Sequence, residues 1–104
     1  MIIRFERTGG FTAIPLRVVI DTASLDPGDD QNFRKMIDTA GFFRLPEKMN
    51  SPAGGNDRFN YKVTVEDTGK GHSVEIGDSA LTETLQPLIQ RLESMARTQR
   101  PPKP

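Results

Sequence analysis

Two residue types that often carry chemistry in proteins, histidine and cysteine, are nearly missing from this sequence, and its only histidine is His72. Zinc sites gather several histidine, cysteine or carboxylate ligands, and nucleophilic catalysis pairs a nucleophile with a base such as histidine. The sequence has no cysteine and no second histidine to complete either arrangement around His72. Because this histidine follows the turn sequence DTGKG, we interpret it as a solvated loop residue.

Three short segments share residue types with ligand-binding loops but lack the spacing that such loops require. DPGDDQN places Gly28 too early for a calcium loop and has no glutamate to close it, so it is interpreted as a helix start. TGKGHS and GGND lack the context of a phosphate loop and are typical of turns. No pair of carboxylates lies where a pocket is suggested. We therefore predict no catalytic residue, no metal site and no cofactor, and binding rather than catalysis.

Length and composition restrict the class of protein further. A chain of 104 residues predicts one domain. Its 14 basic residues are balanced by 14 acidic ones, so there is no basic excess to attract nucleic acid. No apolar run approaches the roughly 18 residues of a membrane span, and the first residues lack the pattern of a secretory signal. We expect a soluble, cytoplasmic protein that is monomeric when free and binds neither nucleic acid nor membranes.

Two alternating apolar runs joined by a glycine pair form the stretch RFERTGGFTAIPLRVVID, Arg4 to Asp21. Gly9 and Gly10 tolerate the positive φ angles that a tight connection between twisted strands needs, so this stretch is predicted to be a β-hairpin. Phe11 lies at its tip, where few strand neighbours could cover it. Its side chain either folds back as a lid over the core or is offered to a partner, and the sequence leaves both alternatives open.

The other elements follow from changes in hydrophobic period. A helix is predicted from the cluster at Asp26 to Gly41, which is placed to end it as a left-handed cap. The stretch from Pro46 to Arg58 lacks periodicity and is predicted to be a loop. Two alternating strands follow, joined by a turn from Asp67 to Gly71. A last amphipathic helix is predicted to begin between Thr82 and Leu85, with Pro87 either in its first turn or at a kink.

This order of elements, ββαββα, predicts an α+β fold with a four-stranded antiparallel sheet and two helices packed on one face. At least two of Phe42, Phe43 and Leu45 are expected to close the core beneath the first helix. Residues 1–97 would form the single domain, and residues 98–104 a disordered, basic, proline-rich tail. The open face of the sheet would carry mixed charges from Arg4, Glu6, Arg17, Lys62, Thr64, Glu66 and Glu75.

Four segments, in their order and spacing, are similar to the emfourin family of proteinaceous inhibitors of thermolysin-like metallopeptidases. They are RFERTGGFTAIPLRVVID, AGFFRLP, FNYKVTVED and LTETLQPLIQRL, and the resemblance covers about residues 2–96. It implies a cytoplasmic bacterial protein that binds a thermolysin-like zinc peptidase and blocks its cleft. If the catalytic zinc is contacted, the ligand would be a carboxylate, a backbone carbonyl or His72, and the sequence does not choose among them.

The glycine turn with its apolar residue is the most specific part of this resemblance. We therefore predict that the hairpin tip binds the peptidase, with Phe11 as its anchor. The predicted protease-binding residues are Arg7, Thr8, Gly9, Gly10, Phe11 and Thr12. The alternative is a non-enzymatic interaction module that holds a protein partner on the open face of the sheet.

Overall fold

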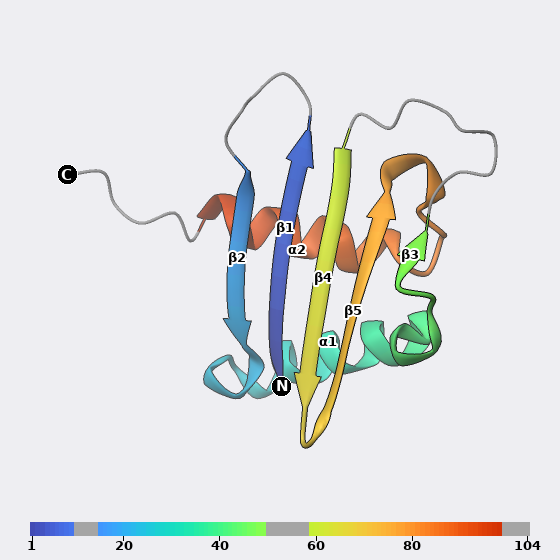
Figure 1. The fold of residues 1–104 in the computed structure, drawn as a ribbon. Helices are drawn as coiled ribbons and strands as arrows, with labels where there is room; N and C mark the ends of the chain where they lie inside the picture. Colours follow the sequence, from blue (N-terminus) through green and yellow to red (C-terminus); the bar gives the residue numbers. More distant parts are fainter. Residues whose placement is uncertain (10–14, 50–58, 99–104) are drawn as a thin grey trace.

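The N-terminal strand shows how the sequence pattern becomes structure: Ile3 and Phe5 are buried on one side, and Arg4 between them is exposed on the other. The computed structural model describes residues 1–9, 15–49 and 59–98, and these form an α+β fold (Figure 1). Its elements are β1 (Ile2–Gly9), β2 (Leu16–Asp21), η1 (Thr22–Ser24), α1 (Pro27–Ala40), η2 (Phe42–Arg44), β3 (Lys48–Met49), β4 (Phe59–Asp67), β5 (Lys70–Gly77), η3 (Asp78–Ala80) and α2 (Gln86–Thr98).

In the described residues the sheet has five strands in the order β2-β1-β4-β5-β3 and is mixed, so the prediction of four antiparallel strands was wrong. The four longer strands pair antiparallel as predicted, but β3 runs parallel to β5, with Lys48 opposite Glu75. β3 lies in the stretch predicted to be a loop from Pro46 onward. Two residues cannot show an alternating pattern, and backbone pairing holds them, including the Glu75 N–H that donates to the Glu47 carbonyl oxygen at 2.7 Å.

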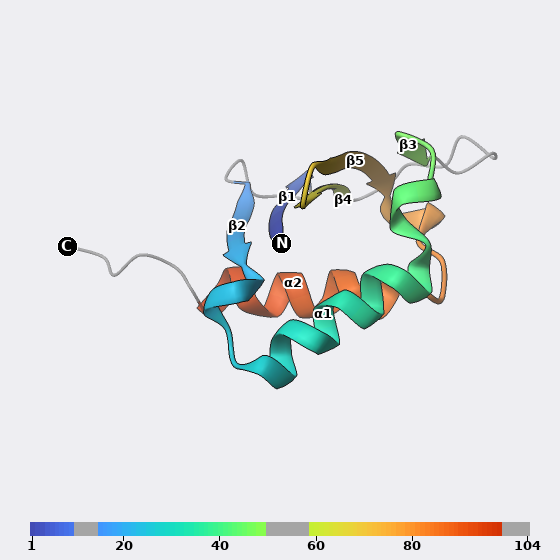
Figure 2. The same cartoon turned by 90° about the horizontal axis from the view of Figure 1, so that it is seen from below.

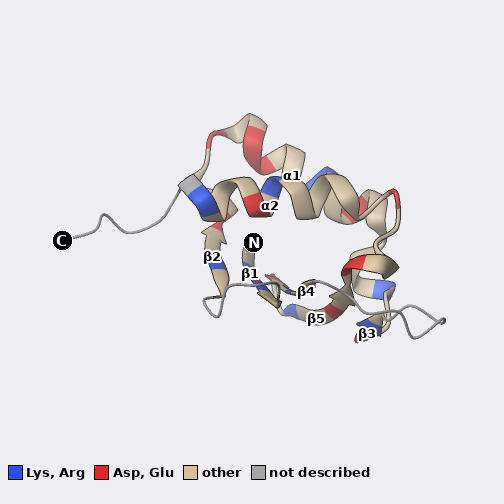
Figure 3. Ribbon diagram, turned by 90° about the horizontal axis from the view of Figure 1, so that it is seen from above, with Lys and Arg blue, Asp and Glu red and all other residues tan. Residues whose placement is uncertain are grey.

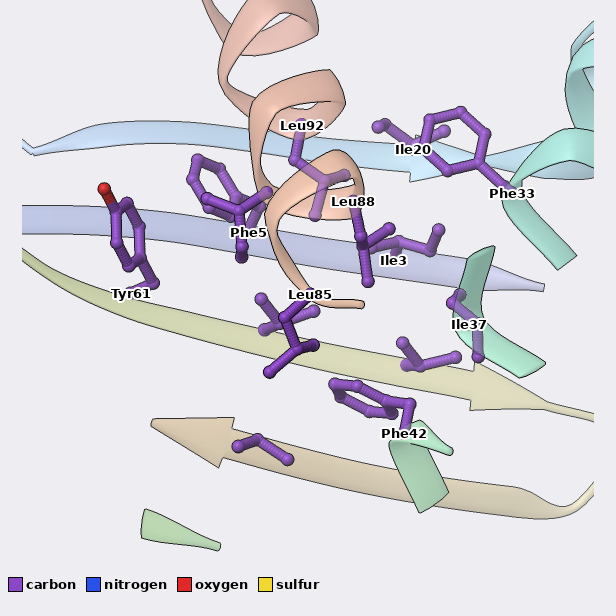
Figure 4. Packing of buried hydrophobic residues seen from close by; sticks show 14 of the residues in the cluster. Ile3, Phe5, Ile20, Phe33, Ile37, Phe42, Tyr61, Leu85, Leu88 and Leu92 are labelled. Atoms are coloured by element: carbon purple, nitrogen blue, oxygen red, sulfur yellow. The ribbon is translucent and has the colours of Figure 1, made fainter. Parts of the chain in front are cut away.

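Both helices cover the same face of the sheet and leave the other face open, as predicted (Figure 2). The inward side chains of the strands meet the apolar stripes of α1 and α2 between these two layers (Figure 4). Leu88 and Leu92 of α2 are fully buried against this sheet, and each contributes roughly 1.5–3 kcal/mol of transfer free energy. The core consists of Ile3, Phe5, Val18, Ile20, Phe33, Ile37, Phe42, Tyr61, Val63, Val65, Val74, Ile76, Leu85, Leu88, Ile89, Leu92 and Ala96.

The helices begin and end near the proline and glycine residues that predicted their ends. Pro27 opens α1, and Gly41 closes it in the left-handed region at φ 60°, as predicted. α2 begins at Gln86, just after the predicted range, and this places Pro87 in its first turn, where the missing N–H costs no helical hydrogen bond.

The two aromatic residues after α1 differ in burial, as the sequence predicted. Phe42 is completely buried and Leu45 packs against the core, whereas Phe43 is 37% exposed. Phe43 lies edge-on to the ring of Phe42, with their centroids 5.8 Å apart. Only one aromatic of the pair therefore closes the core beneath the end of α1.

The open face of the sheet carries cross-strand ion pairs. Arg4 of β1 pairs with Glu66 of β4, and Arg17 of β2 pairs with Glu6 of β1. Figure 3 shows basic and acidic residues interspersed along the elements rather than separated by sign. Within the described ranges, no helix is long and apolar enough to cross a membrane.

Candidate functional site

The two long connections of the chain leave the sheet at the same end. β1 ends at Gly9 and β4 begins at Phe59, and these two residues are opposite each other in the antiparallel pair (Figure 1). The chain re-enters the sheet at Leu16, which pairs with Arg7. The β1–β2 hairpin predicted from the sequence is therefore present, and its connection starts and finishes at this end.

The predicted protease-binding segment is only partly within the described structure. Arg7, Thr8 and Gly9 lie at the end of β1, whereas Gly10, Phe11 and Thr12 lie outside the described residues. Whether Phe11 is a lid or a contact residue thus stays a prediction. Gly9 has φ 99°, in the region that side chains with a Cβ avoid, so glycine suits the start of this connection.

Arg7 is turned toward the helix-covered side of the sheet. Its Nη1 lies 2.5 Å from Oε2 of Glu93 in α2, and the two side chains are only 19% and 17% exposed. The guanidinium carbon also lies 4.5 Å from the centre of the Phe59 ring, a cation–π contact. Arg7 therefore joins the last part of β1 to the first residue of β4 and to α2.

The neighbours of Arg7 complete a polar cluster above the core. The backbone N–H of Phe59 donates to Oδ2 of Asp78 at 3.3 Å, which ties the start of β4 to η3. Tyr61 pairs with Arg7 across the sheet and stacks on Phe5, with centroids 6.1 Å apart. Burial raises the pKa of the Tyr61 hydroxyl, and the carboxylates of Glu93 and Asp78 raise it further.

Sequence reasoning missed Glu93, Phe59 and Asp78 as members of this cluster. Glu93 is separated from Arg7 by 86 positions, and a glutamate on an amphipathic helix normally indicates a solvated face. The only signal was the break in the β1 pattern, where a charged residue occupies the inward position after Ile3 and Phe5. A charge at such a position requires a partner from another element.

His72 is not the solvated loop residue that the sequence suggested. It lies in β5 opposite Val65, is half-buried, and its Nε2 is 2.6 Å from the carbonyl oxygen of Leu45. Its ring also meets Phe42 edge-on, with centroids 5.6 Å apart. Because Val65 pairs with Ile3 at the start of β1, His72 belongs to the end of the sheet away from Gly9.

The open face beside the Gly9 end has a depression of about 340 Å³. Thr8 and Asn60 face each other there, and the charged side chains of Glu6, Lys62 and Glu75 continue the same lining. These groups can hydrogen-bond to a partner but include no nucleophile with an adjacent base. No group of three or more potential metal ligands occurs in the described part of the chain.

The comparisons with known proteins place the chain in a family. The sequence model of the Emfourin family matches residues 5–93, which is most of the chain. No curated protein and no solved structure matches it. Emfourins are an inhibitor family directed at metallopeptidases, which favours inhibition over catalysis. The chain, with its helix-backed sheet and glycine-turn hairpin, therefore belongs to the Emfourin family.

Proposed function

We propose that the chain inhibits thermolysin-like zinc metallopeptidases by placing the connection between β1 and β2 in the active-site cleft. The observation that carries this proposal is the match to an inhibitor family over residues 5–93, which includes the glycine-turn hairpin. The contact segment is Arg7 to Thr12, and Phe11 is its anchor. The inhibitor acts in the bacterial cytoplasm as a single copy per peptidase.

The architecture supports this mode of inhibition. Thermolysin-like clefts bind extended peptide and accept a bulky apolar side chain just beyond the scissile bond. Gly9 and Leu16, where the connection starts and finishes, belong to paired strands covered by α2. A segment held by such a support has less conformational entropy to lose on binding than a free peptide. A single apolar anchor presented in this way can carry most of the binding free energy.

The direct test is titration of thermolysin with the pure chain and with the variant Phe11→Ala. The chain should abolish peptidase activity at near-stoichiometric amounts. Truncation of an interface anchor typically costs 2 kcal/mol or more, so Phe11→Ala should weaken inhibition about thirtyfold or more with little change in stability. Phe43→Ala is the control, because Phe43 is an aromatic residue that is 37% exposed and lines a depression with Met1, at the other end of the sheet.

Two results would contradict this assignment. If Phe11→Ala unfolds easily while its folded fraction inhibits normally, Phe11 is a core lid and the contact lies elsewhere. If the unmodified chain does not inhibit at all, the proposal fails as a whole.

The second candidate function is a non-enzymatic interaction module that binds a protein on the open sheet face. It is favoured by Val19 of β2, which is 63% exposed beside a depression of about 330 Å³. An exposed valine ringed by Arg4, Arg17 and Lys62 has the character of a contact surface with a polar rim. Val19→Arg should leave inhibition of thermolysin unchanged if the hairpin is the contact, and should abolish binding if this face is.

A further inference from the structure

The guanidinium of Arg7 links the end of β1, from which the proposed inhibitory connection leaves the sheet, to β4 and α2. Arg7 lies on β1 just before Gly9, pairs with Glu93 of α2 at 2.5 Å, and covers the ring of Phe59 at 4.5 Å. The N–H of Phe59 is in turn held by the carboxylate of Asp78. The end of β1, the start of β4, α2 and η3 are therefore connected through a short series of contacts.

The burial of the Arg7–Glu93 pair, which joins β1 to α2, distinguishes it from the arginine–glutamate pairs between strands on the open face of the sheet. Arg17 and Glu6 are joined at the same distance of 2.5 Å, but their side chains are 67% and 32% exposed. Exposed pairs of this kind contribute little, because water and salt screen them. A pair that is mostly removed from water is screened less, and separating it would leave the guanidinium of Arg7 without a carboxylate and Glu93 with only the 61% exposed Arg97, at 3.9 Å. Arg7 is thus held in one geometry.

This geometry leaves Arg7 poorly placed to contact a peptidase with its charged group. The guanidinium would have to leave both Glu93 and the Phe59 ring in order to reach outward. Its neighbour Thr8 lies on the open face, and Gly9 is exposed at the start of the connection. The side chain of Arg7 therefore supports the contact segment from beneath.

We propose that Arg7 is a positioning residue of the inhibitor, which orients the β1–β2 connection for binding through its contacts with Glu93 and Phe59. This inference rests on the proposed function of that connection. Without these contacts, the end of β1 samples orientations that do not fit the cleft. The apparent affinity then falls in proportion to the fraction of molecules that are in the competent orientation, while the contacts made in the complex stay the same. The loss of affinity therefore appears as a lower association rate constant.

The test compares Arg7→Met, which keeps most of the side-chain volume, with Arg91→Met as the matched control. Arg91 lies on α2 and also pairs with a carboxylate, that of Asp29 in α1 at 3.4 Å, but both side chains are 44% exposed. Association and dissociation rates with thermolysin are measured where circular dichroism shows each variant fully folded. Arg7→Met should lower the association rate constant about tenfold, equivalent to about 1.4 kcal/mol, and leave the dissociation rate constant within about twofold. Arg91→Met should change neither.

Two further variants test whether the effect of Arg7 depends on its contact with Glu93. Glu93→Gln keeps the side-chain shape and removes the charge, so it should lower the association rate in the same direction. Combined with Arg7→Met it should add little further loss, because both changes remove the Arg7–Glu93 interaction. The other ion pair that Glu93→Gln removes is with Arg97, which is 3.9 Å away and 61% exposed, and such a pair contributes little. If Arg7→Met does not fold, Arg7→Lys and Glu93→Gln provide the same comparison. Fully additive losses, or a loss that lies wholly in the dissociation rate, would overturn the positioning role.

A measurement on the free protein, without a peptidase, tests this inference independently of the proposed function. Amide hydrogen exchange at Gly9 and Phe59 should accelerate about tenfold or more in Arg7→Met, while exchange at Val65 stays unchanged. If the unmodified chain fails to inhibit thermolysin, the proposed function is rejected, and the exchange rates still decide whether Arg7 orders this end of the sheet. Unchanged exchange at both residues would reject the inference even in an active inhibitor.

Discussion

Nε2 of His72 lies 2.6 Å from the carbonyl oxygen of Leu45, and this contact joins β5 to the segment that follows α1. The same histidine ring packs edge-on against Phe42, which is completely buried. The segment between α1 and β3 is thereby attached to the sheet by a polar contact as well as an apolar one. His72 has a structural role at the end of the sheet away from the proposed contact segment.

We predict that His72→Phe destabilises the fold without affecting inhibition. Phenylalanine keeps the ring packing against Phe42 but cannot make the hydrogen bond, so the half-buried carbonyl of Leu45 loses its partner. The free energy of unfolding should fall by about 1–3 kcal/mol, measured by urea denaturation. Lys70→Ala, an exposed change on the same strand, serves as the control. An unchanged urea midpoint for His72→Phe would show that the contact contributes nothing.

Leu88→Ala should cost about 2–5 kcal/mol of unfolding free energy, because it removes a completely buried side chain between α2 and the sheet. The measurement is again urea denaturation, since the midpoint should move while the slope stays constant. Gln90→Ala is the matched change on the exposed side of α2 and should have little effect. Equal midpoints for the two variants would contradict the packing of α2 on the sheet.

Tyr61 should make stability fall at high pH. Its pKa is raised above the ordinary value of 10.0 by burial and by the nearby carboxylates. The unfolded chain therefore loses this proton at lower pH than the folded chain, so the stability is fully present below about pH 10 and is lost as pH rises through the folded pKa. Thermal denaturation of Tyr61→Phe against the unmodified chain isolates this group from the lysines. Parallel profiles for the two proteins would mean that the tyrosine does not contribute.

Removal of residues 99–104 should leave both the melting temperature and the inhibition unchanged. Thr98, predicted as the first residue of the tail, is instead the last residue of α2, and the rest of the predicted tail lies outside the described residues. Residues 99–104 have no apolar side chain to anchor them. The truncation keeps α2 complete, because the helix extends to Thr98. A clear loss of inhibition with an unchanged melting temperature would make the tail part of the binding surface.

Local pattern predicted the long elements because burial follows their periods. The alternation of Ile3, Arg4 and Phe5 indicated a half-buried strand, and the spacing of Leu85, Leu88 and Leu92 indicated one face of a helix. Gly41 ends α1 at φ 60°, a left-handed conformation that glycine adopts easily because it has no Cβ, so this helix end could be predicted from the sequence alone. β3 escaped prediction because two residues have no period.

The sequence by itself determined the order of the elements, the apolar face of each, and the glycine-turn hairpin at residues 4–21 that carries the family resemblance. Only the tertiary structure decided that Lys48 and Met49 extend the sheet, that His72 bonds to Leu45, and that Arg7 turns inward to Glu93. The physical reason is that hydrophobic period is a local property, readable within one element. The partner of a polar group depends on which distant segments the packed core brings together, and this becomes known only when the chain has folded.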